Sequence, residues 1–197
     1  MKIVFATNNE NKVREIRHIL GNSFNLLSLK DLTINEEIPE NKPTLEGNAM
    51  QKARHIYKML NLNVFADDTG LEIEALNGLP GVHSARFAGE NRDSAANIEK
   101  VLAMMGSSGN RRARFRTVIA LIMDGREYLF DGTVEGTIIS EKRGSDGFGY
   151  DPVFVPVGTN LTFAEMPLNE KNKISHRAIA FEKLRDFLCQ YNYSDNK

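Results

Sequence analysis

Two long strands joined by a two-residue turn constrain the fold of this chain more than any other feature of its sequence. Residues 112–123 are predicted to form a long strand that becomes fully apolar from Val118 to Met123. The pair Asp124-Gly125 favours the tight turn of a β-hairpin, and residues 126–139 are the predicted return strand. The fold must therefore contain a sheet that includes this hairpin.

Short apolar strands and amphipathic helices alternate along the rest of the chain. It opens with a strand at 2–6, the polar turn Thr7-Asn8-Asn9 and a helix whose apolar residues recur from Val13 to Leu20, with Gly21 as its stop. Further strands are predicted at 26–29, 64–66, 71–75 and 153–155, and further helices at 49–60, from Asp93 or Ser94 to Met105, and from Ser175 with Ala178, Phe181, Leu184 and Leu188 inward. Strands mixed with helices, plus the hairpin, predict an α/β fold with a mixed sheet. We expect a single domain over 1–197 with a frayed polar tail at 192–197.

The composition is that of a globular protein in a reducing compartment. Cys189 is the single cysteine, which excludes an intrachain disulfide. The 25 basic and 26 acidic residues nearly balance, which argues against a large nucleic-acid footprint because phosphate neutralisation needs a basic excess or a basic face. The longest apolar run, 118–123, is far short of the ~20 residues of a membrane span, and the apolar start is too short for a signal peptide. We therefore expect neither a membrane nor a nucleic-acid partner.

The first segment that suits chemistry follows the opening strand. Thr7-Asn8-Asn9-Glu10-Asn11-Lys12 places backbone N–H groups at a helix N-terminus and a lysine in its first turn, a composition that suits phosphate binding. The Gly-x-x-x-x-Gly-Lys pattern of a P-loop is missing. The alternative is an ordinary capped helix with a solvated lysine.

The second segment is Asp67-Asp68-Thr69-Gly70, at the expected end of the strand 64–66. Two adjacent carboxylates at the end of an apolar strand are costly unless they are paired or bind a metal. Oxygen ligands suit Mg²⁺, and one carboxylate could orient or deprotonate a water molecule. The alternative is a plain acidic turn.

Two further segments suit the recognition of a nucleotide. In 144–152, three glycines allow close approach to a ligand, and Phe148 and Tyr150 offer flat faces on which a base could stack. The segment 171–177 brings cations to the expected start of the last helix, which suggests an anion. A flexible hairpin end and a solvated basic turn are the respective alternatives.

The arginines of the hairpin favour a less specific interpretation. Arg112, Arg114 and Arg116 fall on one face of the strand, and Ala113 and Phe115 on the other. We favour a solvated or dimer-facing strand over a nucleic-acid surface. No zinc spacing, serine-nucleophile elbow or Gly-x-Gly-x-x-Gly fingerprint is present, which disfavours those chemistries.

Taken together, these segments resemble the inosine triphosphate pyrophosphatase family, also called Ham1-like or deaminated-purine nucleoside triphosphate pyrophosphatases, and its bacterial-type members most. The resemblance spans nearly the whole chain, and its anchors occur in the family's order: 6–12, 46–49 with 52–55, 66–71, 80–81 with 84–87, 147–152 and 174–177. Bacterial members often have Thr-Gly-Asn where this chain has Thr7-Asn8-Asn9. We expect the loop to bind phosphate in spite of this difference, because backbone N–H groups provide most of the phosphate contacts.

The resemblance implies two α/β lobes around a long mixed sheet, with the active site in the cleft between the lobes. It implies Mg²⁺-dependent hydrolysis of ITP, dITP or XTP to the monophosphate and pyrophosphate. It also implies a homodimer in the cytosol that removes these nucleotides from the pool.

The expected site combines these implications with the residues themselves. Asp68 is the candidate for activating the attacking water and for contacting Mg²⁺, and Lys12 is the candidate catalytic lysine. Glu40 fits best as the family's upstream acidic ligand, while Glu46 and Asp67 remain alternatives. The expected substrate-binding residues are Thr7, Asn8, Asn9, Glu10, Asn11, Lys12, Thr69, Phe148, Gly149, Tyr150, Asp151, Lys171, His176 and Arg177.

The sequence leaves three other functions open. A nucleotide sensor without turnover would not need adjacent carboxylates beside a phosphate loop. A nucleic-acid module built on 111–116 would bind oligonucleotides with a steep salt dependence. A pyrophosphatase of related fold could act on pyrimidine or modified nucleotides, which a substrate panel would reveal.

Overall fold

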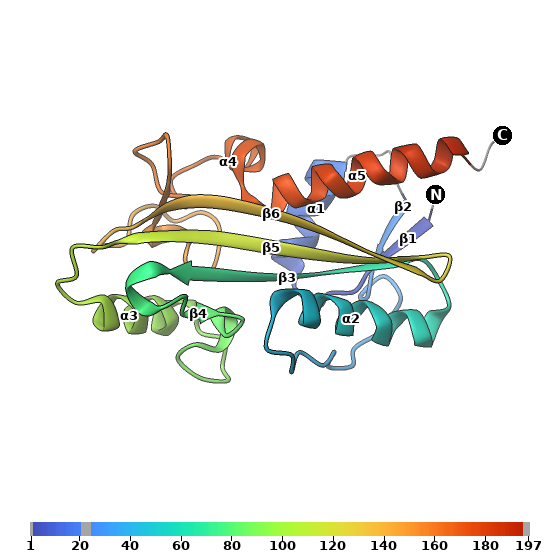
Figure 1. The fold of residues 1–197 in the computed structure, drawn as a ribbon, viewed down its shortest axis with the longest axis horizontal. Coiled ribbons are helices and arrows are strands. Elements are labelled where there is room, and N and C mark those ends of the chain that lie inside the picture. Colours follow the sequence, from blue (N-terminus) through green and yellow to red (C-terminus); the bar gives the residue numbers. More distant parts are fainter. Residues whose placement is uncertain (1, 21–24, 195–197) are drawn as a thin grey trace. The chain divides into compact units, whose positions relative to one another are not determined.

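The computed structural model describes residues 2–20 and 25–194, which form a mixed sheet with helices (Figure 1). The strands are β1 (Lys2–Phe5), β2 (Asn25–Ser28), β3 (Val64–Ile73), β4 (Pro80–Gly81), β5 (Arg112–Met123), β6 (Arg126–Ile138) and β7 (Phe154–Pro156). The α-helices are α1 (Glu10–Leu20), α2 (Leu45–Leu60), α3 (Ser94–Met105), α4 (Leu168–Ile174) and α5 (His176–Ser194), and 3₁₀ turns lie at Glu74–Leu76, Ser84–Arg86 and Asp151–Val153. The strand order is β2-β1-β3-β5-β6-β7, with β4 paired to β3.

The sheet contains both kinds of strand pairing. β1 runs parallel to β2 and to β3, whereas β3 with β4 and β6 with β7 are antiparallel. The expected α/β class with a mixed sheet is therefore confirmed. The chain divides into unit 1 (Met1–Asp68, Thr117–Gly132 and Arg177–Lys197) and unit 2 (Thr69–Arg116 and Thr133–His176).

The core of unit 1 follows from strand alternation. One set of alternate side chains packs with the apolar faces of α1 and α5, and Phe5, Phe65 and Phe181 form an aromatic group at its centre. Val4 and Val64 belong to the opposite alternation and are fully buried. That second face is covered by α2, which lies across the sheet from α1 and α5 (Figure 1).

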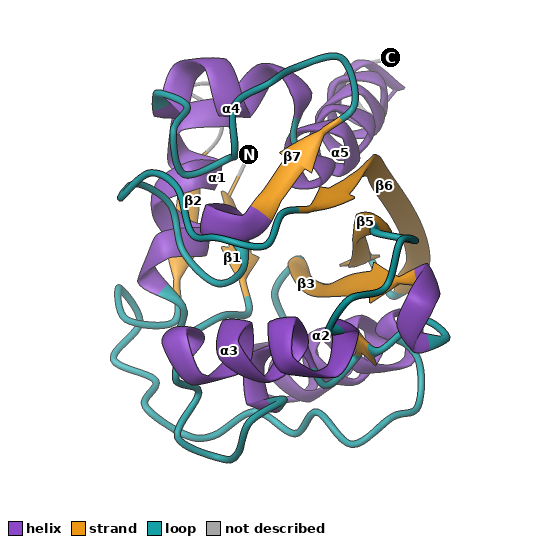
Figure 2. Cartoon of the chain, turned by 90° about the vertical axis from the view of Figure 1, so that its left-hand side faces the viewer, coloured by secondary structure: helices purple, strands orange, loops and turns teal. Residues whose placement is uncertain are grey.

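Unit 2 has a core of its own. The apolar side of α3 (labelled in Figure 2) contributes Ile98, Val101 and Met105, which join residues from the strands and from the segment 150–166. Phe115, Phe154 and Phe163 form a second aromatic group. Asp93 caps α3 by accepting from the N–H groups of Ala95 and Ala96, one of the two caps that the sequence suggested.

The hairpin agrees closely with the sequence. β5 has the bounds expected for it, and β6 ends one residue earlier than expected. Asp124 and Gly125 have φ angles of 49° and 77°, the left-handed pair that a tight type I′ turn requires. β5 also alternates as expected, with Ala113 and Phe115 buried.

The two strands expected at 64–66 and 71–75 are wrong as separate elements. β3 continues without a break from Val64 to Ile73, so Asp67 and Asp68 lie inside a strand rather than in a turn after it. Strand propensity depends strongly on surroundings, and carboxylates are tolerated in a buried strand when cations neutralise them. The cations that do so here come from distant parts of the chain.

The C-terminal region also corrects two expectations. Lys171 lies in the separate helix α4, and α5 begins at His176, so the segment 171–177 is not the start of one helix. α5 extends through Ser194, so the residues 192–194 of the expected frayed tail are helical. The remaining tail residues and the expected stop at Gly21 lie outside the described residues. None of the described helices combines the length and the apolar character needed to cross a membrane.

Gly70 is a position where the close approach of two strands requires glycine. A Cβ atom on Gly70 would lie 2.7 Å from the carbonyl oxygen of Gly81 in β4. We expect Gly70→Ala to lower the free energy of unfolding by about 1–3 kcal/mol, because backbone on both sides must shift. Urea unfolding measures this, with Gly109→Ala as the matched control, since a Cβ there meets nothing within 4 Å. Equal stability of the two variants would contradict the prediction.

Candidate active site

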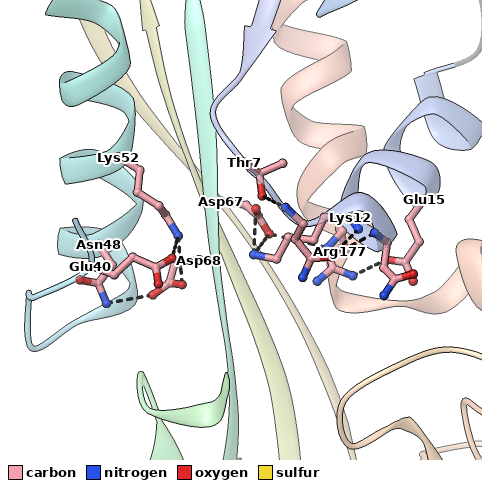
Figure 3. A network of polar contacts seen from close by, with 11 residues as sticks. Thr7, Lys12, Glu15, Glu40, Asn48, Lys52, Asp67, Asp68 and Arg177 are labelled. Carbon is pink, nitrogen blue, oxygen red and sulfur yellow. Dashed lines mark hydrogen bonds and ion pairs between the residues drawn. The ribbon is translucent and has the colours of Figure 1, made fainter. Parts of the chain in front are cut away.

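Adjacent positions in β3 send Asp67 and Asp68 to opposite faces of the strand (Figure 3). Successive side chains of a strand point to opposite faces. Asp68 therefore faces α2, whereas Asp67 faces α1 and the start of α5. Both are buried, with 1% of Asp67 and 9% of Asp68 exposed. Each carboxylate therefore belongs to its own group of partners, which we name the Asp68 group and the Asp67 group.

The Asp68 group consists of Asp68, Glu40, Asn48 and Lys52. The Lys52 ammonium lies 2.6 Å from Glu40 Oε1 and 3.3 Å from Asp68 Oδ1, so two carboxylates converge on one cation. Asn48 Nδ2 donates to Asp68 Oδ2 at 3.1 Å. Asn48 and Lys52 are four residues apart on α2 and therefore lie on the same side of the helix.

The Asp67 group consists of Asp67, Lys12, Arg177 and Glu15. The Lys12 ammonium lies 2.9 Å from Asp67 Oδ2 and 3.0 Å from Oδ1, and Arg177 Nε lies 3.6 Å from Oδ2. Arg177, which is 2% exposed, also pairs with Glu15 of α1. Lys12 is thus not the solvated lysine of the alternative interpretation.

The two carboxylates differ in their protonation behaviour. Burial by itself would raise the pKa of Asp67, but the charges of Lys12, Arg177 and Lys52 outweigh it and leave the pKa lowered. Burial raises the pKa of Asp68, and Lys52 and Lys12 oppose this effect only in part. Two titratable groups whose surroundings drive their pKa values apart are suited to different roles. Asp67 is a fixed counter-ion, and Asp68 is the better candidate for accepting a proton.

The pairing of the carboxylates in the two groups indicates where a divalent cation fits. Two cations, Lys12 and Arg177, contact Asp67, whereas the Lys52 ammonium contacts the carboxylates of both Glu40 and Asp68. Across residues 2–20 and 25–194, no three His, Cys, Asp or Glu side chains gather as a metal cluster. Mg²⁺ commonly takes only one or two carboxylates and completes its shell with water and substrate phosphates. Glu40 with Asp68 fits that pattern, and this arrangement favours Glu40 over Asp67 or Glu46.

The α1 N-terminus has the geometry of a capped helix with an accessible start. Asn9 Oδ1 accepts from the N–H groups of Asn11 at 3.0 Å and Lys12 at 3.3 Å, and Thr7 Oγ1 accepts from Asn9 N–H at 3.2 Å. Asn8, Asn9 and Glu10 are exposed, whereas Thr7 and Asn11 are half-buried. The Asn8 side chain donates to Glu36 O at 3.1 Å.

Three of the expected substrate-binding residues form one buried contact in unit 2. The Lys171 ammonium lies 2.8 Å from Asp151 Oδ2, and the same oxygen accepts from the N–H of Phe148 at 2.8 Å. Lys171 also lies over the Phe148 ring, 5.2 Å from its centroid. A Cβ atom on Gly147 would lie 2.2 Å from Asp151 Oδ2, so this turn depends on glycine.

Four further expected residues are also placed. Tyr150 is buried and its hydroxyl donates to Ser84 O at 2.9 Å, while burial raises the pKa of the phenol. The His176 ring stacks on Phe115 with centroids 4.6 Å apart. Gly149 has a φ of +63°, and Thr69 is half-buried in β3. All of these residues except Arg177 and the 7–12 segment belong to unit 2.

Sequence reasoning missed Glu15, Asn48 and Lys52 as members of these groups. A usable signal existed for two of them, because Asn48 and Lys52 lie among the buried apolar residues Ala49, Ala53 and Ile56 of α2. A polar or charged side chain on the apolar side of a helix is buried only when it has a partner. Glu15 similarly lies beside Ile16 on the buried side of α1.

Three comparisons place the chain among known proteins. A family model described as "Ham1 family" matches residues 3–187. A "dITP/XTP pyrophosphatase" of Porphyromonas gingivalis is 55% identical over 95% of this chain and 97% of that protein, and one of Bacillus subtilis is 46% identical over 94% and 96%. The solved Ham1 protein of Staphylococcus aureus superimposes with a TM-score of 0.88 at 40% identity, over 97% of this chain and 100% of that one.

Asp67→Asn is expected to destabilise unit 1 because it leaves buried cations without their carboxylate. We expect a loss of about 3 kcal/mol in the free energy of unfolding at pH 7. The native pKa of Asp67 is lowered, so its charge stabilises the fold at every pH above the unfolded value of ~3.9. That stability disappears as the pH falls through the lower native pKa, and the gap between the two proteins closes there.

Urea unfolding of both proteins between pH 7 and pH 3 measures this gap. Asp131→Asn is the control, because the Asp131–Lys183 pair is more than half exposed and removing it should change stability by less than ~1 kcal/mol. Asp67 does not act as a buried counter-ion if the difference in the free energy of unfolding between Asp67→Asn and the unmodified protein stays constant down to pH 3. The same conclusion follows if that difference is no larger than the one that Asp131→Asn causes.

Proposed function

This chain belongs to the Ham1 family, and from that premise we propose that it hydrolyses the deaminated purine nucleotides ITP, dITP and XTP to the monophosphate and pyrophosphate. The full-length relatives named "dITP/XTP pyrophosphatase" support this activity. The structural observation that carries the proposal is the convergence of Glu40 and Asp68 on Lys52. The adjacent residue Asp67 contacts Lys12 in the first turn of α1, and a helix N-terminus suits phosphate.

Glu40 and Asp68 are the residues that would hold Mg²⁺. When bound, the ion would lower the pKa of a water molecule and neutralise charge on the phosphates. Lys52 keeps the two carboxylates close together, since its ammonium contacts both. Burial and the charges of Asp68, Glu40 and Asp67 act on Lys52 in opposite directions, and its pKa is raised, so it stays protonated at neutral pH.

Asp68 would accept the proton of the attacking water. The water oxygen bonds to the α-phosphorus, the bond from that phosphorus to the α–β bridging oxygen breaks, and pyrophosphate leaves. The raised pKa of Asp68 suits this role better than the lowered pKa of Asp67. Asp67 instead holds Lys12 and Arg177 in place.

The segment from Thr7 to Lys12 would hold the triphosphate. Its exposed residues Asn8, Asn9 and Glu10 surround the start of α1, where the helix dipole favours an anion. Lys12 supplies the nearby positive charge, although burial lowers its pKa against the opposing effect of Asp67.

We assign recognition of the base to the segment that carries Phe148. Phe148 offers its ring for stacking, and Asp151 and Lys171 fix the turn that carries it. We assign Thr69, Gly149, Tyr150 and His176 to the same task, and Arg177 to the phosphates as well as to Asp67.

We further propose that the chain works as a cytosolic homodimer without a nucleic-acid partner. The single cysteine supports a reducing compartment. Two arginines of β5 are paired with carboxylates, Arg112 with Glu74 and Arg114 with Glu72, which reduces the positive charge that a nucleic acid would meet.

The proposed function predicts strong discrimination between nucleotides. We expect kcat/KM for ITP to exceed that for ATP and for GTP by at least ~10²-fold, about 2.7 kcal/mol. A donor that bonds the 6-oxo group of hypoxanthine would face the hydrogens of adenine's 6-amino group, and leaving such a donor unpaired is costly. Guanine must be rejected at its 2-amino group. The measurement is pyrophosphate release from ITP, dITP, XTP, GTP, ATP and pyrimidine triphosphates.

The same panel separates the other functions. Comparable values for ITP and GTP would contradict the proposal, and preference for a pyrimidine would favour the related pyrophosphatase activity. Binding of ITP without pyrophosphate release, with and without Mg²⁺, would indicate a sensor.

Asp68→Asn is expected to lower turnover of ITP by about 10²–10⁴ while the fold persists, because the change keeps the shape and removes the proton acceptor. Steady-state kinetics at saturating Mg²⁺ measure the loss, and circular dichroism checks the fold. Asp131→Asn removes an exposed carboxylate of the same unit and should leave turnover unchanged. Turnover of Asp68→Asn within about threefold of the unmodified protein would exclude Asp68 from the mechanism.

A further inference from the structure

Asn48 is a buried side chain that uses both ends of its amide. It is 3% exposed on the first turns of α2. Its Nδ2 donates to Asp68 Oδ2 at 3.1 Å, and its Oδ1 accepts from the backbone N–H of Lys42 at 2.8 Å. Both partners belong to unit 1, one in β3 and the other in the segment that precedes α2.

The orientation of this amide is determined by its partners. A backbone N–H can only donate, so the carbonyl end of Asn48 must face Lys42. The NH₂ end is then directed to Asp68, where an ionised carboxylate is a good acceptor. Asn48 therefore holds one oxygen of Asp68 through a neutral donor, while the other oxygen faces Lys52.

The same side of α2 fastens the segment that carries Glu40. Lys52 contacts Glu40, and Gln51 exchanges two hydrogen bonds with Asn41, at 2.9 and 3.2 Å. Asn48 accepts from Lys42. Asn48 and Lys52 contact both this segment and Asp68, whereas the two hydrogen bonds of Gln51 described above are to Asn41 of the segment (Figure 3 shows Asn48 and Lys52 beside Asp68).

We propose that Asn48 is a positioning residue that aligns Asp68 with Glu40 for a divalent cation and the attacking water. The inference rests on the proposed function for its kinetic consequence. Asn48 fixes Asp68 Oδ2, which leaves Oδ1 on the side shared by Lys52 and Glu40. Because the amide is neutral, it sets this geometry without neutralising either carboxylate.

The test compares two carboxamide deletions on one helix. Asn48→Leu removes the contact with Asp68 and the one with Lys42, and Gln51→Leu removes two bonds to the same segment without touching Asp68. Groups that orient metal ligands typically affect metal affinity or activity by 10–100-fold. We expect Asn48→Leu to lower kcat for ITP at least ~10-fold with less than about threefold change in KM, and Gln51→Leu to stay within about twofold.

A readout that does not depend on turnover is Mn²⁺ binding in the absence of nucleotide, followed by electron paramagnetic resonance. We expect Asn48→Leu to weaken it by at least ~10-fold relative to Gln51→Leu. If Asn48→Leu unfolds, Asn48→Ser serves instead, because its shorter hydroxyl cannot span both partners and the vacated space admits water. The inference is overturned if Asn48→Leu, or Asn48→Ser in its place, has a kcat for ITP and a Mn²⁺ affinity that are both within about threefold of those of Gln51→Leu.

The two proposals fail in different ways. If the unmodified protein releases no pyrophosphate from ITP, the proposed function is wrong, yet Mn²⁺ binding still tests the role of Asn48. If the unmodified protein turns over ITP and Asn48→Leu matches Gln51→Leu, the proposed function stands and the positioning role is wrong.

Discussion

The burial of two adjacent carboxylates in one strand is the constraint on which unit 1 depends. Asp67 and Asp68 contact different cations, because β3 directs the two carboxylates to opposite faces. A buried, unpaired carboxylate is costly, so each face needs its own cation. Lys12 and Arg177 meet this need on one face and Lys52 on the other. These ion pairs thereby fix the positions of α1, α2 and α5 against β3.

The carboxylates on the two faces of β3 are neutralised in different ways. The Asp67 group joins two cations to one carboxylate, and its members contact one another, which suits a structural role beside the start of α1. In the Asp68 group the carboxylates of Glu40 and Asp68 share the Lys52 ammonium, and a further donor to Asp68 is a neutral amide. Two carboxylates held close together suit a divalent cation. Their convergence is therefore a stronger indication of a metal site than the presence of carboxylates alone.

The sequence predicted those features that depend on local chemistry. The hairpin bounds, the left-handed turn at Asp124 and Gly125 and the Asp93 cap all follow from residues close together in the chain. The continuity of β3 did not follow, because it depends on Lys12, which lies 55 residues before Asp67. The Glu15–Arg177 pair spans 162 residues and left no local pattern. Asp68 and Glu40 were proposed from resemblance and residue type, whereas Asn48 and Lys52 could have been found as polar residues on a buried helix side.

The placement of the Asp68 group also explains how a precise arrangement can include an irregular segment. Sites built on helices and strands are held more rigidly than sites on loops. Asp68 lies in β3 and Asn48 and Lys52 lie on α2, but Glu40 precedes the helix in a segment without regular structure. Three side chains of α2, at positions 48, 51 and 52, form hydrogen bonds with that segment. Of these side chains, Lys52 contacts Glu40 itself, so the Glu40 carboxylate is held from α2 although its own segment lacks regular structure.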